Sequence, residues 1–72
     1  MTEKELLWYL GQKIKRLRTE KGISQISFSE MIGIENSNLS RIESGRTNPT
    51  YTTLNKIATA LEISLSDLVS VD

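Results

Sequence analysis

The chain has 72 residues, of which 38% are apolar and 25% are charged, and nine basic and nine acidic side chains give it a formal net charge of zero. This length and composition predict one small globular domain over residues 1–72 and exclude a disordered, collagenous or low-complexity chain. The zero net charge argues against a polybasic nucleic-acid tail, although the sum hides where the charges lie.

The sequence contains no cysteine and no histidine. This excludes a disulfide framework, a thiolate nucleophile, Cys- or His-based metal sites and histidine acid–base catalysis. No other convergent set of nucleophile, base or metal ligands is evident, so we expect neither an enzyme nor a bound cofactor or metal. The longest apolar run, residues 6–10, is far too short for a membrane span. We therefore expect a cytoplasmic protein that has no membrane contact.

Apolar residues recur at helical spacing along most of the chain. The first stripe consists of Leu6, Leu7, Leu10, Ile14 and Leu17. Gly22 follows this stripe as a helix stop. Ser24 suits the N-cap of a second helix, which ends at Gly33. The apolar residues of this second helix are Phe28, Met31 and Ile32.

Three further helices are predicted in the second half of the chain. One runs through Leu39 and Ile42 to Gly45, and an Asn48–Pro49 turn follows it. Thr50 is a suitable cap for the next, whose stripe consists of Leu54, Ile57, Ala58 and Leu61. Ser64 with Asp67 resembles a capping box that opens a short last helix containing Leu65, Leu68 and Val69. No segment shows strand-like alternation, so we expect a compact all-α domain of five helices.

The second and third predicted helices are separated by only a few residues around Gly33, which is the helix-turn-helix arrangement. Leu39 and Ile42 set the core side of the third helix. Its outward side carries Ser37, Ser40, Arg41 and Ser44, with Asn36 and Asn38 at its N-terminal end. Arginine and asparagine side chains can read guanine and adenine in the major groove. The alternative is an ordinary solvated surface of polar residues.

Several motifs in register carry a resemblance to a known family. They are Ser24-Gln25, Phe28, Ser29-Glu30, residues 32–34, residues 39–46 and Asn48-Pro49. Together they resemble the phage-repressor/Cro family of XRE-type helix-turn-helix regulators, over about residues 6–69. The resemblance implies a lambda-repressor-like five-helix domain in which the third helix reads double-stranded DNA.

The resemblance also implies roles for individual residues. The positions that match base-contacting residues of the family are Asn36, Ser37 and Arg41. The positions that match backbone-contacting residues are Gln25, Ser40, Ser44, Arg46 and Asn48. Arg18 and Glu43 match a partly buried structural ion pair, and each lies on the edge of the core side of its helix.

Three positions depart from the family pattern. Glu35 stands where a Ser or Thr N-cap is common, and its carboxylate suits the helix dipole but repels phosphate. Asn36 is then an alternative cap, which would weaken its role as a base reader. Glu62 stands where a Gly commonly ends the fourth helix, so the chain must turn there without glycine. Ile26 replaces a usually charged residue and is expected to be exposed.

The charges are unevenly distributed along the chain. Residues 13–21 carry five cations and one acid, whereas residues 57–72 carry Glu62, Asp67 and Asp72 without any base. This predicts a fold with one positive and one negative end.

Trp8 lies away from the core side of the first helix, and we expect it to form a homodimer interface with Tyr9, Val69 and Val71. The alternative is that Trp8 covers the C-terminal tail of its own chain.

These features together predict a homodimeric repressor or controller protein that reads a palindromic operator. A protein-interaction module of the same fold, such as an antitoxin that contacts its partner through Ile26 or Trp8, is the alternative.

Overall fold

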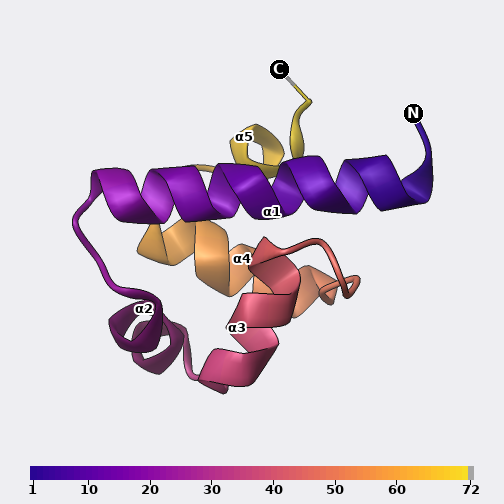
Figure 1. The fold of residues 1–72 in the computed structure, drawn as a ribbon. Helices are drawn as coiled ribbons and strands as arrows, with labels where there is room; N and C mark the ends of the chain where they lie inside the picture. Colours follow the sequence, from indigo (N-terminus) through magenta and orange to yellow (C-terminus); the bar gives the residue numbers. More distant parts are fainter. Residues whose placement is uncertain (72) are drawn as a thin grey trace.

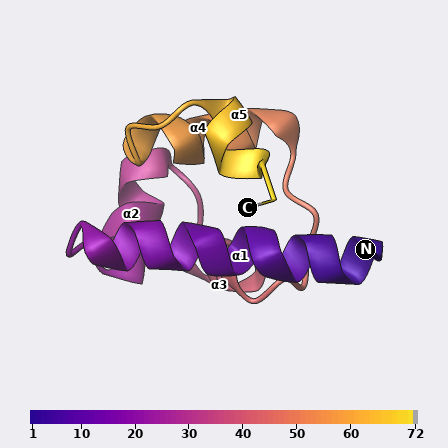
Figure 2. The same cartoon turned by 90° about the horizontal axis from the view of Figure 1, so that it is seen from above.

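The computed structural model describes residues 1–71, which form five helices and no strand. The helices are α1 (Glu3–Glu20), α2 (Gln25–Ile32), α3 (Asn36–Glu43), α4 (Tyr51–Ala60) and α5 (Leu65–Val69). The long α1 lies across α3, α2 packs against α3 and α4, and α5 packs against both α1 and α4 (Figures 1 and 2). The predicted all-α, five-helix architecture is confirmed.

The helix boundaries follow from local capping chemistry. The hydroxyls of Ser24, Thr50 and Ser64 accept hydrogen bonds from backbone N–H groups in the first turns of α2, α4 and α5. Each bond satisfies one of the donors that a helix N-terminus leaves unpaired. A full capping box occurs at the start of α1, where Thr2 and Glu5 bond reciprocally, so α1 begins before the first apolar residue of its stripe.

Gly33 ends α2 and redirects the chain toward α3. Its φ of 71° places it in the left-handed region, which glycine adopts without a steric penalty. The helix-turn-helix therefore has the turn residue that the sequence predicts. Ser29 is buried and its Oγ donates to the Ile26 carbonyl at 2.7 Å, which leaves a small side chain where α2 meets its neighbours.

Each helix contributes side chains to a single core. The buried apolar residues are Ile14, Phe28, Ile32, Leu39, Ile42, Ile57, Ala58, Leu61 and Leu68. Leu6 and Met31 belong to the apolar stripes that predict the core-facing sides of the first two helices, but they are 43% and 57% exposed. Leu6 is exposed because it lines an open groove between α1 and the C-terminal tail. Met31 lies about 100° around α2 from the middle of its buried stripe.

The basic segment of residues 13–21 lies beside the acidic C-terminal segment, so the expected separation of charge is wrong. Lys21 Nζ lies 3.1 Å from a carboxylate oxygen of Glu62, and Lys13 Nζ donates to the backbone carbonyl of Asp67. Basic residues of α1 therefore neighbour the acidic segment because α5 packs on α1. Asp72, the remaining acidic residue of that segment, lies outside the described residues.

Glu62 makes the turn after α4 with a φ of 61°, the one non-glycine residue with positive φ in residues 1–71. This confirms that the chain turns there without glycine. None of the helices in that range is long and apolar enough to cross a bilayer.

Candidate nucleic-acid interface

Helix α3 has one buried and one open side. Leu39, Ile42 and Glu43 are buried against the rest of the fold. The exposed side chains of the helix and its C-cap include Asn36, Ser37, Ser40, Arg41 and Ser44. These are the positions for which the sequence predicts DNA contact, and the structure brings them together along one open helix. They offer short hydroxyl and amide groups plus one guanidinium, a set that can donate to and accept from base edges.

Glu35 is the N-cap of α3, with φ −70° and ψ 145°, and its side chain makes no capping hydrogen bond. Asn36 is the first residue inside the helix, so the alternative in which Asn36 is the cap is wrong. The amide of Asn36 remains on the exposed surface. The open N-terminus of α3 leaves backbone N–H groups without a side-chain cap from Glu35.

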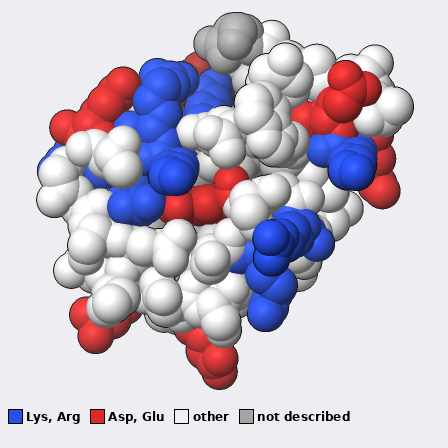
Figure 3. Space-filling view, viewed as in Figure 1, with Lys and Arg blue, Asp and Glu red and all other residues white. Residues whose placement is uncertain are grey.

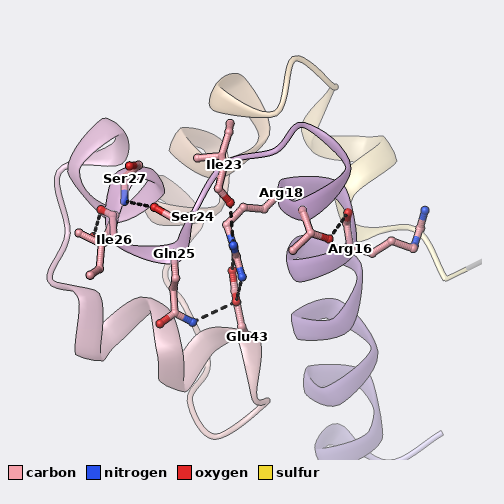
Figure 4. Close-up of polar contacts among 10 residues, drawn as sticks. Arg16, Arg18, Ile23, Ser24, Gln25, Ile26, Ser27 and Glu43 are labelled. Carbon is pink, nitrogen blue, oxygen red and sulfur yellow. Dashed lines mark hydrogen bonds and ion pairs between the residues drawn. The ribbon is translucent and has the colours of Figure 1, made fainter.

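A buried polar network fixes α3 against α1 and α2 (Figure 4). Arg18 binds Glu43 through two hydrogen bonds, from Nε to Oε2 at 2.7 Å and from Nη2 to Oε1 at 2.9 Å. The Nη1 group of Arg18 donates to the Ile23 carbonyl at 2.8 Å. Gln25 Nε2 donates to the same Glu43 oxygen at 3.1 Å. Arg18 and Glu43 are 6% and 3% exposed, so this ion pair is shielded from solvent.

Gln25 is half-buried at the first position of α2, where its side-chain amide has two N–H donors. One amide N–H donates to Glu43, and an amide nitrogen has a second N–H that can donate elsewhere. The Glu43 carboxylate therefore orients the side chain that the sequence predicts as a phosphate contact.

The segment after α3 folds back onto the last turn of that helix. The Arg46 N–H donates to the Arg41 carbonyl at 2.9 Å, and the Ser44 hydroxyl donates to the same carbonyl at 3.2 Å. Arg46 and Asn48 are both exposed in this segment. The loop and α3 thus form one continuous polar surface.

Positive charge is sparse on this surface. Figure 3 shows one blue group over the C-terminal half of α1 and another below it, over α3 and the following loop. Arg41 and Arg46 are the cations of residues 36–50, and the acidic Glu30 and Glu35 lie in the preceding helix and turn. The described residues contain no cluster of three or more potential metal ligands. Chemically, the surface suits polar readout with few phosphates neutralised by cations.

Gly11, to which the sequence gave no role, and Gly45, predicted only as the end of the third helix, lie where α1 crosses α3. Gly11 is buried in the middle of α1, and a Cβ there would lie 2.4 Å from the Glu43 carbonyl oxygen. A Cβ on Gly45 would lie 2.8 Å from the Cα of Trp8. The available sequence signal was a glycine inside a strong helical stripe, where alanine would favour the helix by about 1 kcal/mol.

A groove of about 450 Å³ lies between α1 and the C-terminal tail. Its apolar lining includes Leu6, Tyr9, Val69 and Val71, and Lys13 and Arg16 also line it. Tyr9, rather than Trp8, is the ring that faces this groove. The Trp8 ring meets Tyr9 edge-on, with centroids 4.9 Å apart. Trp8 is not among the residues that line the groove beside the tail, so the alternative in which Trp8 covers the tail is not supported.

A family model described as helix-turn-helix (HTH_3) matches residues 14–68. The chain is 43% identical over 61 residues to the control protein C.MunI of a Mycoplasma species, a match that covers 83% of this chain and 82% of that protein. It is 38% identical over 60 residues to the immunity repressor protein of Bacillus phage phi105. That match covers 83% of this chain and 42% of the repressor, so the chain spans less than half of that relative's length.

Solved structures of helix-turn-helix regulators have a similar fold. The restriction-modification controller protein C.AhdI from Aeromonas hydrophila superposes with a TM-score of 0.83 at 35% identity, over 86% of this chain and 94% of that one. The biofilm regulator SinR in complex with DNA superposes with a TM-score of 0.78 at 39% identity, over 85% and 98% of the two chains.

Proposed function

The chain belongs to the HTH_3 helix-turn-helix family of DNA-binding transcriptional regulators, and we propose that it acts as a homodimeric repressor or controller protein on a palindromic operator. The family assignment agrees with the resemblance found in the sequence. In this proposal, α3 enters the major groove of double-stranded DNA, as the second helix of a helix-turn-helix does.

One observation carries this proposal: the open side of α3 is uniformly polar, while its other side is fixed to the fold by buried Leu39, Ile42 and Glu43. A rigidly held helix with short exposed side chains can approach base edges closely. We assign base contact to Asn36, Ser37 and Arg41. Arg41 suits bidentate bonding to guanine, and Asn36 suits adenine.

The remaining polar residues of the surface suit the sugar–phosphate backbone. These are Gln25, Ser40, Ser44, Arg46 and Asn48. Such contacts set the register of the protein on the duplex without reading sequence. The Gln25 amide, which Glu43 orients, supports this role because its direction is fixed before DNA arrives.

Two copies are proposed because one helix of this length reaches only a few base pairs. A two-fold dimer reads two half-sites about 34 Å apart, one DNA turn. The proposed interface is the exposed apolar surface around the groove, formed by Trp8, Tyr9, Val69 and Val71. All four side chains are between 48% and 59% exposed, so the isolated chain leaves this surface uncovered.

The test is selection of binding sequences from a pool of random duplexes, followed by titration of the selected duplex at several salt concentrations. We expect a palindromic consensus and an affinity that falls with salt at a modest slope, near −0.9 per phosphate neutralised by a cation. Recovery of no enriched sequence would contradict operator reading.

That negative result would favour a protein-interaction module, such as an antitoxin. The exposure of Ile26 favours this second function, since its side chain is 61% exposed on α2 next to the proposed DNA surface. An apolar side chain there fits a protein partner better than a phosphate. Substitution of Ile26 by Glu would then abolish partner binding without changing the fold.

A further inference from the structure

We propose that Gly11 and Gly45 are positioning residues for DNA recognition, because they seat the C-terminal end of α3 directly on the backbone of α1. The inference rests on the proposed reading of DNA by α3. It assigns sequence discrimination in part to two residues that cannot contact DNA through a side chain.

The first contact is at Gly11. A Cβ at this position would lie 2.4 Å from the Glu43 carbonyl oxygen, 2.5 Å from the Ile42 carbonyl oxygen and 2.7 Å from the Glu43 carbonyl carbon. All three are backbone atoms of the last turn of α3. Backbone atoms within a helix cannot rotate aside as the end of a side chain can, so the two helices themselves set this distance.

The second contact is at Gly45, immediately after the α3 C-cap. Its φ is 76°, and a Cβ would lie 2.8 Å from the Cα of Trp8, 3.0 Å from the Trp8 nitrogen and 3.2 Å from the carbonyl carbon of Leu7. Trp8 and Gly11 are three residues apart in α1 and so lie on one side of that helix. The two contacts therefore fix both the end of α3 and the start of the loop that carries Arg46.

The size of the expected displacement follows from these distances. Ordinary van der Waals contact begins at 3.4 Å, so a methyl group at Gly11 requires α1 and α3 to separate by up to 3.4 − 2.4 = 1.0 Å at this point. The collision and the Arg18–Glu43 bonds both act on Glu43, at the C-terminal end of α3, whereas Leu39, about one helical turn nearer the N-terminus, is fully buried in the core. Because the C-terminal end would be displaced while Leu39 stays in the core, α3 would rotate about Leu39 rather than move away as a whole.

A rotation of this kind affects the two classes of DNA contact differently. Hydrogen bonds to base edges need their donors and acceptors within a few tenths of an ångström of an ideal position. Long flexible cations keep their attraction to phosphate through such a shift, and that attraction supplies non-specific binding. The ratio of operator affinity to non-specific affinity is therefore the quantity that these glycines control.

The experiment compares Gly11→Ala with the wild-type chain on two duplexes of equal length, the selected operator and a scrambled sequence. We expect Gly11→Ala to lose about tenfold or more in operator affinity, the loss of one base contact, with little change on the scrambled duplex. Circular dichroism confirms folding, and sedimentation confirms an unchanged association state. A substitution that merely unfolds part of the population lowers both affinities equally and leaves their ratio unchanged.

A second pair of variants tests the positioning role if Gly11→Ala does not fold. Gly22 has a φ of 72°, close to that of Gly45, but a Cβ there meets no atom within 4 Å. Asparagine tolerates this left-handed backbone, so Gly45→Asn and Gly22→Asn differ mainly in the collision with Trp8. We expect Gly45→Asn to lower the affinity ratio and Gly22→Asn to leave it at the wild-type value.

The possible outcomes distinguish failure of DNA reading by α3 from failure of the positioning role of Gly11 and Gly45. A wild-type chain that binds both duplexes equally overturns the reading of DNA by α3, and the positioning role is overturned with it. A wild-type chain that discriminates, together with Gly11→Ala and Gly45→Asn variants that discriminate equally well, overturns only the positioning role.

Discussion

The guanidinium of Arg18 binds the carboxylate of Glu43 in a two-bond pair that is almost completely shielded from water, with distances of 2.7 Å and 2.9 Å. The pair joins the last turn of α1 to the last turn of α3 and also holds the Gln25 amide. Removing either partner would leave an uncompensated charge inside the fold.

We therefore expect Arg18→Met to lower the free energy of unfolding by about 3–5 kcal/mol, measured by urea denaturation. The double variant Arg18→Met/Glu43→Leu should be more stable than Arg18→Met alone, because it removes the stranded carboxylate. Arg16→Met is the matched control. Its pair with Glu20 spans 3.6 Å and both side chains are more than half exposed, so a change below about 1 kcal/mol is expected. Equal effects of Arg18→Met and Arg16→Met would contradict the structural role of the buried pair.

Arg41 and Arg46 should give different binding phenotypes if α3 reads bases and the loop contacts phosphate. Arg41→Ala should cost about 1–3 kcal/mol on the operator and relax preference at one base pair in each half-site. Arg46→Ala should weaken all duplexes similarly and reduce the slope of log affinity against log salt by about 0.9 per chain. Salt titrations on operator and scrambled duplexes measure both. A uniform loss for Arg41→Ala would reassign Arg41 to phosphate.

Local chemistry in the sequence was sufficient to predict the helices and the turn between α2 and α3. Ser24, Thr50 and Ser64 cap the helices that their positions predict, and Gly33 has the expected positive φ. Each cap or turn depends on residues that are close together in the sequence, so the residue types and their spacing are enough to predict it.

Features that depend on distant parts of the chain were not predictable in the same way. The role of Gly11 depends on the carbonyl groups of Ile42 and Glu43, about thirty residues away in the sequence. Helical periodicity does not predict where these groups lie relative to Gly11. A helical wheel gives the apolar side of α1 but not how far its neighbours extend, so it did not predict the exposure of Leu6. The DNA-contact assignments remain predictions that the binding experiments test.

Glu62 pays a conformational penalty at the end of α4. A non-glycine residue at a φ of 61° costs about 1–2 kcal/mol, whereas its pair with Lys21 involves a carboxylate that is 79% exposed and contributes little. We expect Glu62→Gly to raise the free energy of unfolding by up to about 1 kcal/mol, after the larger chain entropy of glycine is subtracted. Lys21→Gln is the control, since it removes the ion pair without changing the backbone. A loss of stability in Glu62→Gly that matches the loss in Lys21→Gln would show that the ion pair outweighs the strain.

Glu5 should titrate below its ordinary range. Hydrogen bonds from the Thr2 backbone N–H and then from the Thr2 hydroxyl hold the pKa of the Glu5 carboxylate below the usual 4.5. Because the folded-state pKa is lowered, the capping box is complete above about pH 4.5, and its contribution is lost as the pH falls through the lowered pKa. Titration of the Glu5 carboxylate by nuclear magnetic resonance measures this pKa. Thr2→Ala removes the hydroxyl and should move the pKa part of the way back. An unchanged pKa in Thr2→Ala would assign the shift to the backbone bond alone.

The proposed dimer interface gives a prediction that separates the groove from other exposed apolar residues. Val69 lines the groove beside α1 and is 48% exposed, whereas Met31 is 57% exposed beside a separate hollow between α2 and α4. Val69→Glu should shift the chain from dimer to monomer in analytical ultracentrifugation, because a carboxylate would have to lose its water in the interface. Met31→Glu adds the same charge and should leave the dimer intact. Trp8→Ala should weaken the dimer less than Val69→Glu, since Trp8 borders the groove-lining Tyr9. A dimer that persists in Val69→Glu, or that is lost equally in Met31→Glu, would move the interface away from this groove.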